Sequence, residues 1–210
     1  MLVNFDPLNL ENEPARSHPW GKTAYDERSG QYSNFVTNPE LITTMLEDFK
    51  PHDDRPSIHT FYSFLRWING PDSKLETNDC ALREGVIKNP DAIFKFSHKI
   101  DGRVEILLRE HKVNCHAPIV TWLFRMLSLY LQVERPDFFD ALIDLKNAPT
   151  DYVLLSGNEN SGQRIRITFN AYGNSEAEVW SCLDIVFQSV WKATERLNSA
   201  LSEGDKLTFP

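Results

Sequence analysis

Apolar and polar residues alternate most regularly between residues 91 and 110, and a period of two is typical of half-buried β-strands. The dipeptide Asp101-Gly102 lies in the middle of this run, where it favours a tight turn. A three-residue turn with Gly102 in the left-handed conformation would pair His98 with Val104 and put the large apolar side chains on one face. The pattern therefore predicts a hairpin with one buried face and one wet face.

Two amphipathic helices are predicted near the ends of the chain. The first follows Asn38 and is stopped by Pro51, with apolar residues at helical spacing between them. The second begins at a capping box formed by Ser175 and Glu178, and Gly204 ends it. The last helix is therefore long, with a continuous apolar stripe.

The segment from Ala117 to Val133 is apolar except for one narrow stripe of polar residues, which are Thr121, Arg125, Ser128 and Gln132. A helix of this kind must be covered nearly all round. We expect it to lie between the sheet and a second helical layer, for which Pro136 to Lys146 is the candidate. The apolar segment is about 17 residues long with an arginine in the middle, which is short for a membrane span.

Three further segments complete the predicted sheet. Ile58 to Gly70 fits a helix or a strand, and its aromatic and β-branched content favours a strand. Lys74 to Leu82 would return antiparallel to it and form a four-stranded meander with the first hairpin. A second hairpin is predicted from Tyr152 to Asn170, with its loop at Ser156 to Gly162.

These elements define an α+β fold, with a largely antiparallel sheet of about four to six strands packed against helices. The 210 residues are enough for one full core, so we expect a single domain. Residues 1–36 are rich in Asn, Pro, Gly and charge, which predicts an irregular N-terminal segment.

The chain is acidic, with a formal net charge of −8. Residues 1–55 hold 10 Asp and Glu against 5 Lys and Arg, so most of the excess lies in the first quarter. Negative charge repels phosphate backbones and anionic membranes, which argues against a nucleic acid or membrane partner. It would attract a basic protein.

The beginning of the sequence lacks a basic segment followed by an apolar run, so we expect a cytoplasmic protein. The cysteines Cys80, Cys115 and Cys182 are odd in number and far apart, without a Cys-x-x-Cys pair. Buried reduced thiols are the interpretation that fits this spacing.

No motif identifies a reaction. The loop from Ser156 to Gly162 resembles a phosphate loop but lacks the Gly-Lys-Ser/Thr ending and joins two strands. Cys115 and His116 are neighbours in sequence, and neighbours in an extended segment point in opposite directions.

At the end of the first hairpin, His98, His111 and His116 could gather with Glu110 as metal ligands. Their spacing matches no zinc pattern, and a position on the sheet face explains His98 better.

We therefore predict no catalytic residue, no metal and no cofactor, and we expect a binding protein and not an enzyme.

Two short motifs remain, the run from Phe64 to Gly70, Phe-Leu-Arg-Trp-Ile-Asn-Gly, and the run from Arg135 to Phe139, Arg-Pro-Asp-Phe-Phe, which follows the apolar helix. Together they resemble the pattern of an immunity protein family, number 52, of polymorphic-toxin and type VI secretion systems. In this chain Ile68 interrupts the first motif and Phe138 replaces a tryptophan in the second. The resemblance implies a bacterial cytoplasmic protein that neutralises a cognate toxin by occluding it.

The acidic composition is compatible with that role, because an acidic inhibitor is steered toward a basic enzyme such as a nuclease. The predicted contact residues are acidic side chains with one aromatic anchor, Trp67 or Trp20. The acids are Glu47, Asp48, Asp53 and Asp54.

The alternative is a small-molecule-binding protein or enzyme, with a pocket between the sheet and helix 118–133. Arg125 is the main clue, because a guanidinium on an apolar helix needs a carboxylate, a carbonyl or an anionic ligand. Trp122 and Tyr130 would line the same pocket. A third alternative is a subunit of a homo-oligomer, if the last helix exposes Trp180 or Trp191.

Overall fold

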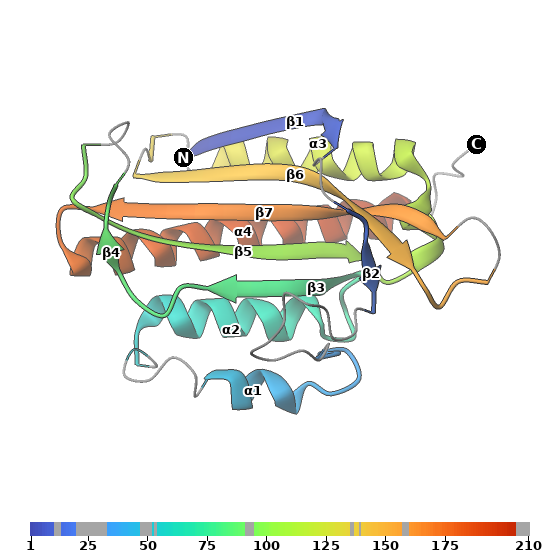
Figure 1. The fold of residues 1–210 in the computed structure, drawn as a ribbon, viewed down its shortest axis with the longest axis horizontal. Coiled ribbons are helices and arrows are strands. Elements are labelled where there is room, and N and C mark those ends of the chain that lie inside the picture. Colours follow the sequence, from blue (N-terminus) through green and yellow to red (C-terminus); the bar gives the residue numbers. More distant parts are fainter. Residues whose placement is uncertain are drawn as a thin grey trace.

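A computed structural model describes residues 1–10, 14–19, 33–46, 52, 54–90, 95–134, 137–138, 140–156 and 160–204. In this part of the chain, seven strands form one mixed sheet whose main path runs β1-β6-β7-β5-β3 (Figure 1). β2 pairs with β6, and β4 pairs with β5. The strands are β1 Leu2–Leu10, β2 Arg16–His18, β3 Leu75–Leu82, β4 Ile87–Lys88, β5 His98–Leu108, β6 Ala141–Tyr152 and β7 Ser161–Gly173.

The helices are α1 Glu40–Leu46, α2 Pro56–Ile68, α3 Ala117–Glu134 and α4 Glu176–Gly204, with a short 3-10 helix, η2, at His111–Cys115. α2, α3 and α4 lie on one face of this sheet, and α1 packs on α2 beyond the β3 edge (Figure 1). α4 packs against β7 and lies between α2 and α3. Alternate side chains of the central strands point into this layer, for example Ile165, Ile167 and Phe169 of β7, and form the core. The predicted α+β class, with a mostly antiparallel sheet, is confirmed.

The two long helices predicted in the second half of the chain are confirmed in position. α3 occupies the predicted apolar segment, and α4 begins at the predicted capping box. The backbone N–H of Glu178 donates to Ser175 Oγ at 3.3 Å, and the Glu178 carboxylate accepts the Asn174 N–H at 2.8 Å. Two of the N–H groups at this helix terminus are thereby satisfied.

The hairpin turn predicted at Asp101-Gly102 is wrong, because both residues lie inside the continuous strand β5. Val104 pairs with Cys80 of β3 on one side and with Ile167 of β7 on the other, not with His98. Gly102 has a packing role instead. A Cβ there would lie 2.6 Å from the Phe169 ring and 2.6 Å from the carbonyl oxygen of Ala81. Glycine permits this close approach of neighbouring strands.

The strand predicted at Ile58 to Gly70 is also wrong, because residues 56–68 form helix α2. Pro56 occupies the first helical turn, and the residues that bury their side chains recur at helical spacing: Ile58, Phe61, Tyr62, Phe64, Leu65 and Ile68. Burial of this face against α4 outweighs the β-propensity of the segment. The strand predicted at Lys74 to Leu82 exists as β3, but it pairs with β5 and not in a meander with Ile58 to Gly70.

The helix predicted at Pro136 to Lys146 is wrong, since β6 begins at Ala141. Ala141, Ile143 and Leu145 are buried at alternate positions, which is the period of a strand. β6 forms the second hairpin with β7, in a register that pairs Asp144 with Thr168. Val153 to Leu155, which the predicted hairpin places in its first strand opposite β7, follow the end of β6 instead.

α3 is not covered all round, contrary to the prediction. Its helical neighbour is α4, and its outer side is exposed at Arg125, Leu129, Gln132 and Val133. α1 corresponds to the first part of the helix predicted between Asn38 and Pro51, and residues 47–50 lie outside the described part of the chain. No helix of the described residues is long and apolar enough to cross a membrane.

The N-terminal segment is more regular than predicted. β1 pairs in parallel with β6 at Leu2 to Phe5, and β2 pairs in parallel with the end of β6, from Arg16 with Thr150 to His18 with Tyr152. β1 is a sheet edge in the strand order, a position that tolerates Pro7 because an edge strand has backbone groups that need no partner.

Candidate functional site

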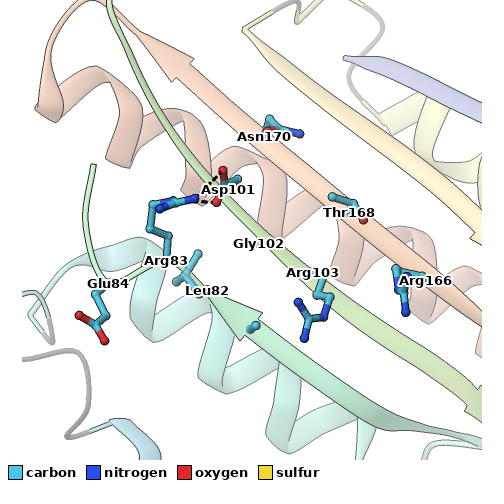
Figure 2. Close-up of a pocket in the computed structure, with 10 residues that line it drawn as sticks. Leu82, Arg83, Glu84, Asp101, Gly102, Arg103, Arg166, Thr168 and Asn170 are labelled. Atoms are coloured by element: carbon cyan, nitrogen blue, oxygen red, sulfur yellow. Dashed lines mark hydrogen bonds and ion pairs between the residues drawn. The ribbon is translucent and has the colours of Figure 1, made fainter. Parts of the chain in front are cut away.

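The face of the sheet opposite the helices is polar and holds a groove of about 700 Å³ across β3, β5 and β7 (Figure 2). It exists because the wet positions of β5 and β7 alternate with the core positions and carry charged or amide side chains. The groove is lined by Ala81, Leu82, Arg83, Glu84, Asp101, Gly102, Arg103, Arg166, Thr168 and Asn170.

Ion pairs hold the charged side chains of the groove in place. Arg83 donates to the Asp101 carboxylate from Nε at 2.8 Å and from Nη2 at 3.2 Å, and Figure 2 marks this ion pair. Arg103 donates to Asp79 from Nε at 3.1 Å and from Nη2 at 2.9 Å. Side chains fixed in this way lose less conformational freedom when they bind a partner.

Next to the groove, the sheet face is buried around one carboxylate, Glu105, which is 0% exposed. Arg164, 1% exposed, donates to Glu105 from Nε at 2.6 Å and from Nη2 at 3.2 Å. Arg166 adds a contact of 2.6 Å, and the Asn78 amide donates at 2.9 Å. Arg164 also donates to the Thr150 hydroxyl at 2.9 Å. We call these residues, with Glu105 at the centre, the Glu105 network.

Burial by itself would raise the pKa of Glu105. The hydrogen bond and charge of Arg164, the charge of Arg166 and the Asn78 amide more than reverse this effect, and the pKa falls to about 2. Glu105 is therefore ionised at neutral pH, as its arginine partners require.

The low pKa of Glu105 predicts a pH dependence of stability. A carboxyl whose pKa is lower in the folded than in the unfolded protein stabilises the fold above its unfolded pKa, and this contribution is lost as pH falls toward the folded value. We expect the free energy of unfolding to fall between about pH 5 and pH 2. Urea unfolding at pH 7, 5 and 3 would measure it, with the Glu105→Gln variant as control.

The difference in unfolding free energy between wild type and Glu105→Gln should be largest at pH 7 and shrink at pH 3, because the Glu105 carboxyl of the unfolded chain is protonated at pH 3 and must lose this proton on folding. A difference that stays constant over this range would contradict the lowered pKa.

At the far end of the network, β2 brings His18 against β3. His18 Nδ1 lies 2.6 Å from Asn78 Oδ1, and His18 Nε2 lies 3.3 Å from Glu76 Oε1. His111 of η2 places Nε2 2.8 Å from the same Glu76 oxygen. The His18 and His111 rings meet edge to face at 4.7 Å, and Tyr152 packs against both. We call His18, Glu76 and His111 the two-histidine cluster.

Burial would raise the pKa of Glu76, but the hydrogen bonds and charges of His111 and His18 lower it to about 2. The cluster therefore holds an ionised carboxylate between two imidazoles. His18 and Glu76 were missed by sequence reasoning, because 58 positions of chain separate them and only the pairing of β2 with β6 brings them together.

The histidines considered as ligands from the sequence are not brought together. His98 contacts the Ser97 hydroxyl at 2.8 Å, and both His116 and Glu110 are exposed. Only His111 belongs to the two-histidine cluster. Cys115 places its Sγ 3.9 Å from the backbone oxygen of His111.

The acidic residues predicted to contact a partner fall mostly outside the described residues: Glu47, Asp48 and Asp53. Trp20 lies outside them as well. Asp54 is exposed. Trp67 is half-buried on α2 between Phe64 and Trp191, at ring distances of 6.3 and 6.4 Å, so it supports the core.

Within the described residues, Arg125, Trp122 and Tyr130 of the alternative pocket do not line one common cavity. Arg125 lies on the exposed side of α3, and Trp122 and Tyr130 pack against the edge of the core. The void between α3 and the sheet is about 10 Å³, which holds one water at most. Tyr130 lines a surface groove of about 410 Å³ between α3 and α4 instead.

The last helix buries Trp180, and Trp191 is half-buried against Trp67. Neither tryptophan is the exposed anchor on which an oligomer was considered. The three cysteines are free thiols, and burial raises the pKa values of Cys80 and Cys182 to about 12. Thiols with such a high pKa are inert nucleophiles.

Comparison with known proteins gives no relative. No family model, no curated protein and no solved structure matches this chain.

Proposed function

We propose that this chain is a protein-binding inhibitor of the immunity class, and that it binds its partner with the helix-free face of the sheet. The observation that carries the proposal is the open polar groove with its fixed charges (Figure 2). Exposed guanidinium, carboxylate and amide groups that are already positioned are typical of surfaces that recognise another protein.

The shape of the groove favours a protein over a small molecule. Small-molecule sites are concave, enclose most of the ligand and are lined mainly by apolar and aromatic side chains. The groove lies open on the sheet face and is lined mostly by charged and polar residues. Between the sheet and α3, where the alternative places a small molecule, core side chains line a void of about 10 Å³.

The charge of the chain supports a basic partner. A net charge of −8 raises the rate at which a basic protein meets the molecule, while the groove, lined by three arginines and two carboxylates, contributes positioned donors and acceptors for specificity. The resemblance of Phe64 to Gly70 to the immunity family agrees with this role. In the structure Phe64 is buried and Asn69-Gly70 closes α2, so the motif supports the fold and not the contact surface.

A steric block of the groove is the first test. Thr168 lines the groove on β7, and Thr168→Trp would fill the space that the partner enters. We expect affinity for the partner captured by the wild-type chain from native lysate to fall at least about tenfold, or ~1.4 kcal/mol. Ser199→Trp on α4 is the matched control, because it adds the same side chain to the helical side of the molecule.

Two outcomes would contradict the proposal: equal binding by wild type and Thr168→Trp, or loss of binding only in Ser199→Trp. Charge reversal of Asp53 and Asp54 separates the two candidate surfaces. If that variant alone loses binding and its salt dependence, the acidic segment and not the sheet face is the contact surface.

A further inference from the structure

The two-histidine cluster has the composition of a metal site, and this inference is independent of the proposed function. We propose that His18, Glu76 and His111 bind a divalent transition-metal cation, with Zn²⁺ the best match. Two imidazole nitrogens and one carboxylate oxygen suit borderline cations of this kind, whereas Ca²⁺ and Mg²⁺ prefer sites built from oxygen alone.

The distances fit one small cation. Zn–N and Zn–O bonds of about 2.0–2.2 Å place tetrahedral donors about 3.3–3.6 Å apart. Glu76 Oε1 lies 3.3 Å from His18 Nε2 and 2.8 Å from His111 Nε2. All three donor atoms lie within 4.8 Å of one another. Shifts of about an ångström, small for a side chain on a short 3-10 turn, would give one cation three protein ligands and leave a fourth position for water.

The hydrogen bonds around His18 turn the correct nitrogen toward the site. Asn78 donates its amide N–H to Glu105, so its Oδ1 is the acceptor that faces His18 Nδ1 at 2.6 Å. His18 Nδ1 must therefore carry the hydrogen. In the neutral ring the lone pair is then on Nε2, which points at Glu76 Oε1. An outer hydrogen bond that fixes the tautomer in this way is typical of metal-bound histidine.

This arrangement needs a positive charge between the groups. A neutral His18 would place a lone pair 3.3 Å from an ionised carboxylate oxygen, inside a site where His18 is only 2% exposed. A cation bound between the two groups would remove this repulsion.

A cation can reach the cluster from solvent, and its binding would stabilise the fold. The side chain of His111 is 21% exposed, so a cation can enter past it. The ligands come from β2, β3 and η2, so a bound ion would link β2 to β3 and η2. Binding to the folded chain would stabilise it by mass action.

The test uses metal-free protein, prepared with a chelator, and Zn²⁺ alone as the probe. We expect calorimetry to show one equivalent bound with a Kd below about 1 μM. The thermal unfolding midpoint should rise on saturation. Co²⁺ in place of Zn²⁺ should give the visible absorption bands of a tetrahedral site.

The variants identify the ligands. His111→Ala removes a partly exposed ligand from a surface turn, and Glu76→Gln keeps the size of the carboxylate. Each should weaken Zn²⁺ binding by about 100-fold or more. His98→Ala and His116→Ala are matched controls, because both remove a histidine outside the cluster, and they should bind Zn²⁺ as the wild type does.

Three results would overturn the proposal: no Zn²⁺ bound by the metal-free chain, binding that survives unchanged in both His111→Ala and Glu76→Gln, or binding lost in the His98 and His116 controls. The first would mean that the cluster is held by contacts of the two histidines with Glu76 alone. Circular dichroism of each variant distinguishes lost ligation from lost folding.

Discussion

Glu105→Ala is expected to lower the free energy of unfolding by about 3–5 kcal/mol, the largest single effect that the structure predicts. Removal of the carboxylate leaves the guanidinium of Arg164 without its anion, 1% exposed and surrounded by β6 and β7. A buried charge without a partner costs far more than the original pair contributed. Urea unfolding followed by circular dichroism would measure the change.

Asp101→Ala is the matched control, since it breaks the ion pair with Arg83 on the same sheet face, where both side chains are partly exposed to solvent. It should cost at most about 1 kcal/mol. Replacing both Glu105 and Arg164 by Leu and Met should recover much of the loss, because neither buried charge then remains. Equal costs for Glu105→Ala and Asp101→Ala would contradict the role given to the Glu105 network.

Gly102→Ala is expected to lower the free energy of unfolding by about 1–3 kcal/mol. The new methyl group would lie 2.6 Å from Phe169 and from the Ala81 carbonyl oxygen, so strand or ring must move. Adding Phe169→Leu to Gly102→Ala should recover part of the loss, which would reveal coupling between the two positions. Denaturant unfolding of the two single variants and the double variant gives the coupling energy.

Gly85→Ala serves as the control, because its new Cβ would meet only the His52 side chain at 3.9 Å, which is ordinary contact. Its effect should stay within about 0.5 kcal/mol. If Gly102→Ala were as mild as Gly85→Ala, or showed no coupling to Phe169, the close approach of β5 and β7 would be refuted.

Sequence patterns correctly predicted the helices α3 and α4, because the residues that favour each helix lie within it or directly before it. The apolar segment of α3 and the capping box of α4 needed no information from elsewhere in the chain. The wet face of β7 was also visible, as Arg164, Arg166 and Thr168 alternate with core residues. That alternation is why a sheet with one polar face could be predicted.

The wrong predictions concern segments whose structure depends on residues far away in the sequence. Gly102 was interpreted as a turn residue because its packing partner, Phe169, is 67 positions away. The parallel pairing of β1 and β2 with β6 joins the first residues to the middle of the chain, and no periodicity reports such pairing. The same pairing places His18 beside Glu76 and His111, so the two-histidine cluster could not be found from spacing.

Carboxylate footprinting tests the central claim, that the helix-free sheet face binds a protein, most directly. A water-soluble carbodiimide would label carboxylates with and without the captured partner, and mass spectrometry would locate the label. Glu84 lines the groove and Glu195 lies on α4, and both are exposed in the chain alone. We predict that the partner protects Glu84 and leaves Glu195 unchanged. Protection of Glu195 with full labelling of Glu84 would contradict the claim and place the binding surface on the helices.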